Sequence, residues 1–149
     1  MRMDASRFTI LLTEDDDGHA ALTLRNIERA GFSGEVLRLR NGQELLDSLD
    51  KEVDRALTGR RLVVLLDIRM PKVDGFEALS RMKSNPRTQP IPVYMFTTTD
   101  NPAEISRAFR LGCNAWVTKP VAYEAFATTV GRLCEFLQTA QVPEWTPES

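Results

Sequence analysis

The residue with the clearest chemical potential is Asp67, a carboxylate at the end of an apolar run. Residues 62–66 are all leucine or valine, and Pro71 and Gly75 break the chain soon after Asp67. Such a run, bounded by a turn, is typical of a strand that is buried on both faces. Ligands of open α/β sheets bind outside the carboxyl ends of the strands, so Asp67 is a candidate reactive or metal-binding carboxylate. An ordinary turn aspartate is the alternative.

Three other predicted strands also end on polar side chains. Acids follow the strand expected at residues 8–13, threonines follow the strand at 93–96, and a lysine follows the strand at 115–118. Because the carboxyl ends of parallel strands lie along one edge of a sheet, these side chains should meet Asp67 there. The set is Glu14, Asp15, Thr97 and Lys119.

This set could bind a metal ion and accept a phosphoryl group. Crowded carboxylates repel one another and favour a hard divalent cation such as Mg²⁺. A carboxylate beside that cation can attack a phosphoryl group and form an aspartyl phosphate. No general base is needed, because the carboxylate is already ionised at neutral pH. Lys119 would supply a second positive charge, and Thr97 could donate a hydrogen bond to a phosphoryl oxygen.

Strand and helix patterns alternate five times along the chain. Apolar runs predict strands at residues 8–13, 35–39, 62–66, 93–96 and 115–118. A segment with helical spacing of apolar residues follows each strand, and the second such segment starts at Asn41 and keeps leucines on one side as far as Leu57. This alternation predicts an α/β fold in which helices cover both faces of a parallel sheet.

Helix-start signals are strongest in two places. Asn101 is a good N-cap, Pro102 suits the first helical position, and Glu104 stands where a capping box places its acid. Asp16 and Asp17 are predicted to be the N-cap and first turn of the first helix.

Composition indicates a single cytoplasmic globular domain. The chain has 149 residues, 42% hydrophobic and 27% charged, and its net charge of −2 gives no field that would favour nucleic acid. No apolar run is long enough to cross a membrane, and the N-terminus does not have the pattern of a signal peptide. The two cysteines, Cys113 and Cys134, are predicted to be buried and reduced.

Taken together, these motifs resemble the receiver domain of two-component response regulators. The resemblance covers residues 8–139, with an N-terminal extension at 1–7 and a C-terminal tail at 140–149. The matching positions, in order, are Glu14-Asp15, Asp67-Ile68-Arg69-Met70-Pro71, Asp74-Gly75, Thr97, Trp116 and Lys119-Pro120.

The resemblance implies a fold and a role for each residue. The sheet would be doubly wound and flavodoxin-like, with five strands in the order 2-1-3-4-5 and five helices. Asp67 would accept a phosphoryl group from the phosphohistidine of a sensor histidine kinase, assisted by Thr97 and Lys119. Thr97 and Trp116 would form the conformational switch, and the bond before Pro120 would be a candidate cis peptide. The implied Mg²⁺ ligands are the side chains of Asp15 and Asp67, Glu14 through water, and the carbonyl of Arg69.

The short tail leaves no room for an output domain, so the sequence predicts a stand-alone regulator. It would signal by phosphorylation-dependent protein–protein interaction and would catalyse only its own phosphorylation and dephosphorylation. The tail carries Trp145 between two prolines, which leaves two readings. It is either disordered or packs on a second protomer, in a homodimer through the last strands, the last helix and the tail. Residues 97–102 and a long second helix also resemble regulators that partner bacterial phytochrome kinases.

Two alternatives remain at the level of sequence. Dehalogenase-like Mg²⁺-dependent phosphatases also form an aspartyl phosphate. Their motif after the strand is Asp-x-Asp, and here Arg69 stands in place of its second aspartate. A receiver that is no longer phosphorylated would act only as an interaction module, yet its usual mark is loss of the acids or the lysine, and all of them are present. His19, the single histidine, is predicted to face solvent.

Overall fold

The computed structural model describes residues 8–50 and 56–147 of the chain, so the predicted N-terminal extension lies outside the described residues. The elements are β1 (Phe8–Thr13), α1 (Asp17–Arg29), β2 (Glu35–Leu39), α2 (Gly42–Ser48), β3 (Arg61–Leu66), α3 (Gly75–Ser84), β4 (Val93–Thr97), α4 (Pro102–Leu111), β5 (Ala115–Thr118) and α5 (Tyr123–Thr139). All four strand pairings are parallel, and the order is β2-β1-β3-β4-β5. The predicted fold class and strand order are therefore confirmed.

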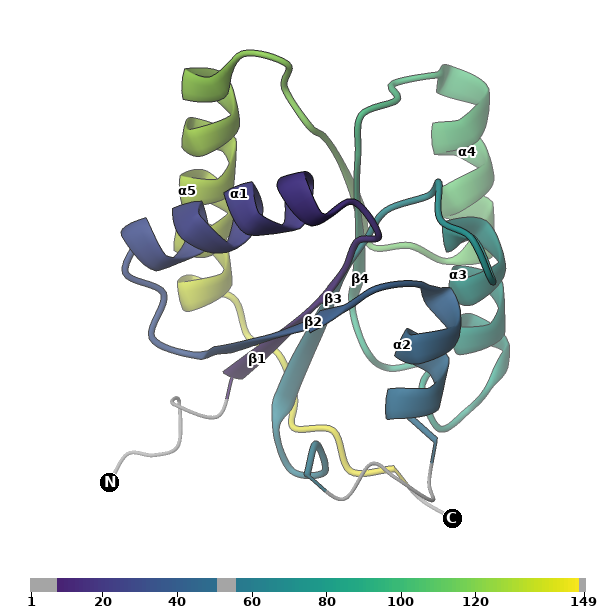
Figure 1. The fold of residues 1–149 in the computed structure, drawn as a ribbon. Helices are drawn as coiled ribbons and strands as arrows, with labels where there is room; N and C mark the ends of the chain where they lie inside the picture. The colour runs from purple at the N-terminus through teal and green to yellow at the C-terminus, as the bar shows by residue number, and fades with distance from the viewer. Residues whose placement is uncertain (1–7, 51–55, 148–149) are drawn as a thin grey trace.

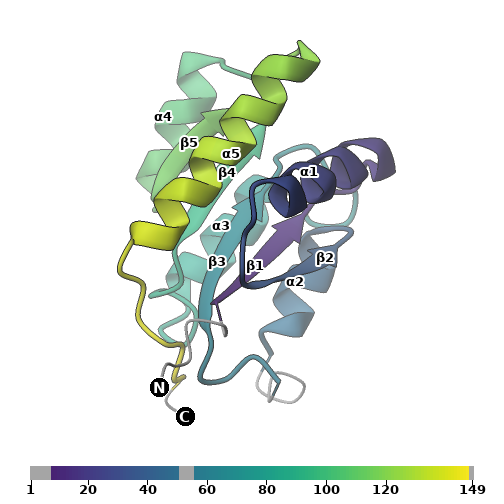
Figure 2. The same ribbon diagram turned by 90° about the vertical axis from the view of Figure 1, so that its left-hand side faces the viewer.

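Helices cover the sheet on both faces, with α1 and α5 on one side and α2, α3 and α4 on the other (Figures 1 and 2). The side chains of the central strand β3 point alternately into the two helix-covered cores. Val63 and Leu65 pack in the core beneath α1 and α5, while Val64 and Leu66 pack in the opposite core. Because β3 is buried on both faces, its sequence reads as one continuous apolar run.

The N-caps form where the sequence predicts them. Asp16 accepts a hydrogen bond from the His19 N–H at the start of α1, and Asn101 accepts from Glu104 at the start of α4. The capping-box role predicted for Glu104 is wrong. Its carboxylate pairs with Arg69 at 3.2 Å, and the Asn101 N–H donates to Thr99 Oγ1 instead.

The second helix is shorter than its leucine pattern predicts, because α2 ends at Ser48. The Ser48 hydroxyl donates to the Leu45 carbonyl, and the N–H of Leu49 bonds the Leu46 carbonyl in a tighter turn. Both contacts compete with continued α-helical bonding. Leu57 still reaches the core, but from a turn, so burial rather than helicity explains its position in the apolar pattern.

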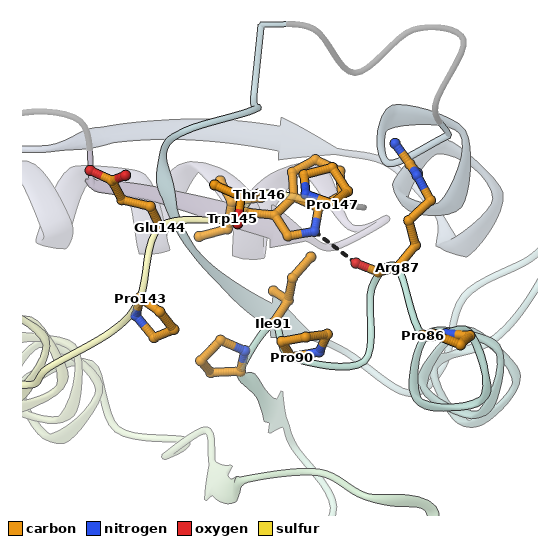
Figure 3. A pocket seen from close by; sticks show the side chains of 11 residues that line it. Pro86, Arg87, Pro90, Ile91, Pro143, Glu144, Trp145, Thr146 and Pro147 are labelled. Carbon is orange, nitrogen blue, oxygen red and sulfur yellow. Dashed lines mark hydrogen bonds between the residues drawn. The ribbon is translucent and has the colours of Figure 1, made fainter. Parts of the chain in front are cut away.

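The C-terminal tail packs on its own chain, which contradicts the predicted disorder, whereas its contact with a second protomer stays a prediction. The Trp145 side chain is 4% exposed, and its indole N–H donates to the Arg87 carbonyl at 2.8 Å (Figure 3). The Trp145 backbone bonds Arg60 and Gly59, and Glu144 forms an antiparallel bridge with Arg61 at the start of β3. These backbone and side-chain contacts give the tail a fixed place at the amino end of the sheet.

Two smaller observations complete the fold. Both cysteines are free; Cys134 is buried and Cys113 is half-buried, so only Cys134 fully matches the prediction. Among the described residues, no helix combines the length and apolar character needed to cross a membrane.

Candidate functional site

A buried charge cluster lies at the carboxyl edge of the sheet. Glu14, Asp67 and Lys119 follow β1, β3 and β5, and each is at most 9% exposed. The Lys119 ammonium contacts the Glu14 carboxylate and lies 3.3 Å from Asp67 Oδ2. Buried charges are costly unless they are paired, and this lysine pairs with two carboxylates at once. The sequence prediction that these strand ends converge is borne out by the geometry.

Three carboxylates at this edge could share one metal ion. Glu14, Asp15 and Asp67 each offer an oxygen, and these oxygens all lie within 4.8 Å of one another. Asp15 is exposed, so an ion would have access from solvent. Burial raises the pKa of the Glu14 carboxyl, the Lys119 charge opposes that change, and the nearby Asp67 adds to it. An all-oxygen set with excess negative charge suits a hard divalent cation.

The loop after β3 fixes the backbone of Asp67. The Asp67 N–H donates to the Thr13 carbonyl at 3.1 Å, and its Oδ1 accepts from the Ile68 N–H at 2.7 Å. The chain then returns so closely that a Cβ on Gly75 would lie 2.2 Å from the Asp67 carbonyl oxygen. Only glycine permits this approach, which explains why the acid and the glycine occur together in the motif.

Lys119 is fixed by its backbone and by an aromatic ring. Its N–H donates to the Thr97 carbonyl at 2.7 Å, which aligns the ends of β4 and β5. Its ammonium lies 5.4 Å from the centre of the Phe96 ring. The peptide between Lys119 and Pro120 is trans, so the predicted cis bond is wrong. Trans is also the form that X–Pro bonds favour intrinsically.

Thr97 and Trp116 lie on the same side of the sheet. Thr97 is buried and shares its strand face with Met95, which pairs in register with Trp116. Trp116 is only half-buried, packs against the core that contains Met95, and donates its indole N–H to Thr118 Oγ1 at 3.2 Å. The predicted switch residues therefore share one face of the sheet, and their coupled movement stays a prediction.

The Arg69 side chain pairs with an acid outside the cluster of Glu14, Asp15 and Asp67. The guanidinium is largely exposed and forms the ion pair with Glu104 of α4 described above. The part predicted for its carbonyl as a metal ligand stays a prediction.

Two residues near the site had no clear signal in the sequence. His19 is half-buried, with its Nδ1 3.4 Å from the Lys119 ammonium, so the solvent-facing prediction is wrong. Its place three residues after the N-cap Asp16 could have indicated a position at the sheet edge. Arg38 of β2 donates to the Glu14 carbonyl, a contact that depends on strand register and could not be inferred from residue type.

Comparisons with known proteins match this arrangement. The family model of the response regulator receiver domain matches residues 10–130. A response regulator receiver domain from Rhodospirillum rubrum is 42% identical, with a TM-score of 0.85 over 93% of this chain and 99% of that one. The phosphorylated cyanobacterial phytochrome response regulator RcpA is 30% identical, with a TM-score of 0.83 over 92% and 99%. The Mn²⁺-bound form of the response regulator Rcp1 is 27% identical, with a TM-score of 0.82 over 91% and 99%. The chain belongs to the response regulator receiver domain family.

Proposed function

We propose that Asp67 accepts a phosphoryl group from the phosphohistidine of a sensor histidine kinase, and that the phosphorylated protein signals by binding another protein. One observation carries this assignment above all. Asp67 is a buried carboxylate at the carboxyl end of β3, 3.3 Å from the Lys119 ammonium and grouped with two further carboxylates.

The transfer needs little from the protein beyond position and charge. One Asp67 carboxylate oxygen forms the new bond to phosphorus, the phosphorus–nitrogen bond of the phosphohistidine breaks, and its electron pair stays on the imidazole. Lys119 offsets the negative charge of the phosphoryl oxygens, and the Thr97 hydroxyl donates a hydrogen bond to one of them. Because Lys119 already contacts Asp67, the positive charge is in place before the donor arrives.

The metal of this site is proposed to be Mg²⁺. Its ligands would be the side chains of Asp15 and Asp67, Glu14 through water, and the Arg69 carbonyl, as the family resemblance implies. The three carboxylates fit such an ion because their oxygens already lie together. The Mn²⁺-bound relative supports a divalent ion in general. When bound, Mg²⁺ would neutralise part of the charge on the phosphoryl oxygens and orient the donor.

The signal would leave the site through Thr97 and Trp116. Phosphorylation adds about −1.5 to −2 units of charge at Asp67, which attracts the Thr97 hydroxyl. Movement of Thr97 would free space on the strand face that it shares with Trp116, and the half-buried indole would rotate inward. The surface formed by α4, β5 and α5 would then change shape and bind its downstream protein.

The proposal favours a signalling protein over the phosphatase alternative. Arg69 stands at the position of the phosphatase acid, and it pairs with Glu104 rather than facing Asp67. The chain would therefore catalyse only its own phosphorylation and dephosphorylation. A cytoplasmic location is proposed because ATP, the source of the kinase's phosphoryl group, is available there.

The kinase and a second protomer are the proposed partners. The likeness to RcpA supports a bacterial phytochrome as the kinase. A homodimer would use β5 and α5, where Phe136 is 54% exposed, since the tail is occupied on its own chain. Sedimentation of the full chain before and after activation measures that dimer.

Beryllofluoride provides a direct test of the assigned site, because it mimics a phosphoryl group on a carboxylate. With Mg²⁺ present, ¹⁹F NMR should show a bound fluoride signal for the wild type, and this signal should be absent for Asp67→Asn. Asp74→Asn is the control, since Asp74 caps α3 instead of joining the acidic cluster. A bound signal that persists in Asp67→Asn would contradict the assignment.

A further inference from the structure

Arg38 makes an unusual set of contacts to the acidic turn after β1. Its Nε and Nη2 donate to the Glu14 carbonyl oxygen at 2.9 and 2.7 Å, so both arms of the planar guanidinium meet one acceptor. Its Nη1 lies 3.0 Å from Asp17 Oδ1. The Arg38 side chain is only 18% exposed, so its contact with the Glu14 carbonyl is partly shielded from solvent, whereas Asp17 is 75% exposed.

Residues at the end of β2 bind both the N–H and the carbonyl of Glu14. The Glu14 N–H donates to the Leu39 carbonyl at 3.0 Å, while the Glu14 carbonyl accepts from Arg38. Strand register explains this placement, because Thr13 lies opposite Leu39 and the turn begins one residue later. The peptide that joins Glu14 to Asp15 therefore has its orientation set by Arg38.

We propose that Arg38 is a positioning residue for the divalent metal site, acting through the Glu14–Asp15 peptide. This inference rests on the proposed metal-binding function. Asp15 is the exposed member of the three carboxylates, and it lies on a turn where rotation of one peptide would move its side chain. Holding that peptide keeps the Asp15 oxygen within reach of those of Glu14 and Asp67. Partners that orient metal ligands in this way typically change affinity by about 10–100-fold when they are lost.

The positive charge of Arg38 offers a competing explanation with the opposite sign. A cation beside the site repels a metal ion, so a purely electrostatic role predicts tighter binding when the charge is removed. Arg40 is a matched control for charge. Its guanidinium lies 3.0 Å from the same Asp17 oxygen, but it is 61% exposed, and its described side-chain contacts do not include the Glu14 carbonyl.

The test measures Mg²⁺ affinity of the full chain by calorimetry for the wild type and three variants. Arg38→Lys keeps the positive charge but loses the planar guanidinium. Arg38→Gln loses the charge and keeps one donor nitrogen, in its amide group. Arg40→Gln removes only the neighbouring charge. We expect about 10-fold or greater weakening for both Arg38 variants and a change of less than about 2-fold for Arg40→Gln. Thermal unfolding in EDTA identifies any variant that does not fold, and the other Arg38 variant then decides.

A kinetic readout separates positioning from a general structural defect. The Mg²⁺ concentration for half-maximal phosphorylation by acetyl phosphate should rise in Arg38→Lys, while the rate at saturating Mg²⁺ should match the wild type. Wild-type affinity in both Arg38 variants, or tighter binding in Arg38→Gln, would overturn the inference. Absence of Mg²⁺ binding by the wild type would instead overturn the proposed metal site itself, so the two failures are distinguishable.

Discussion

At the residue scale, the site depends on close backbone approaches as much as on charged side chains. Lys72 and Val73 adopt left-handed φ values of 50° and 70°, and the Val73 carbonyl accepts a hydrogen bond from the Gly42 N–H. Such conformations cost of order 1–3 kcal/mol each for residues other than glycine. The surrounding contacts maintain this turn, and the turn brings Gly75 against the Asp67 carbonyl.

Substitution of Gly75 by alanine should damage both stability and phosphorylation. The added Cβ would lie 2.2 Å from the Asp67 carbonyl oxygen, so the backbone of the phosphoacceptor must move. We expect a loss of about 1–3 kcal/mol in the free energy of unfolding, measured with urea, and slower phosphorylation.

Gly131 provides the matched control for this substitution. It lies within α5, where a Cβ meets nothing within 4 Å, so Gly131→Ala should stabilise by about 0.5–1 kcal/mol. A Gly75→Ala variant as stable and as reactive as the wild type would refute the close-approach explanation.

Thiol reactivity tests burial at the same scale. Burial raises the pKa of the Cys134 thiol to about 11 and has the same effect on Cys113. The neutral thiol therefore dominates up to high pH, and at pH 8 only about one thiol in a thousand is ionised. Native protein should react slowly with a thiol reagent such as Ellman's reagent at pH 8, about tenfold faster per pH unit up to pH 10, and rapidly once unfolded. Fast reaction of both thiols at pH 8 would contradict this.

At the element scale, the tail shows where sequence patterns stop being informative. An aromatic residue between two prolines has no period, so nothing in the sequence indicated which surface it would contact. The structure places Trp145 in the core beneath α2 and α3, with Arg87 5.3 Å from its ring. The tail thus completes the hydrophobic core at the amino end of the sheet.

A chain that ends at Ala140 should be less stable but unchanged in oligomeric state. Loss of the buried indole removes burial that typically contributes about 3 kcal/mol or more, measured as the free energy of unfolding. Sedimentation should give the same number of protomers for both chains, because the tail contacts its own domain.

Val121→Ala is the control for that truncation, since Val121 is fully exposed and its loss should cost far less stability. A dimer that dissociates when the tail is removed would show instead that the tail contacts a second protomer.

At the scale of the whole molecule, the topology could be predicted well and the side-chain environment only in part. Parallel strands bring their carboxyl ends to one edge, so Asp67, Lys119 and Glu14 could be grouped from their positions alone. The contacts of His19 with Lys119 and of Arg38 with Glu14 could not be predicted in this way, because they depend on rotamers and strand register. The end of α2 was misjudged because Leu57 serves the same core from outside the helix.

Tryptophan fluorescence should report the proposed transition across the molecule. Trp116 is half-buried near the phosphoryl-accepting edge, whereas Trp145 is buried at the amino end of the sheet. Beryllofluoride with Mg²⁺ should therefore change the emission of wild type and of Trp145→Phe, and leave Trp116→Phe nearly constant. A change of equal size in Trp116→Phe would exclude Trp116 as the moving side chain.

Intact mass after incubation with acetyl phosphate is the most direct measurement of the central claim. With Mg²⁺, the wild type should gain a single phosphoryl group, and the gain should disappear with EDTA or with Asp67→Asn. Very fast hydrolysis could hide the adduct, so continuous release of phosphate is measured in the same sample. A phosphoryl group that still appears on Asp67→Asn, or a wild type that neither gains mass nor releases phosphate, would contradict Asp67 as the phosphoacceptor.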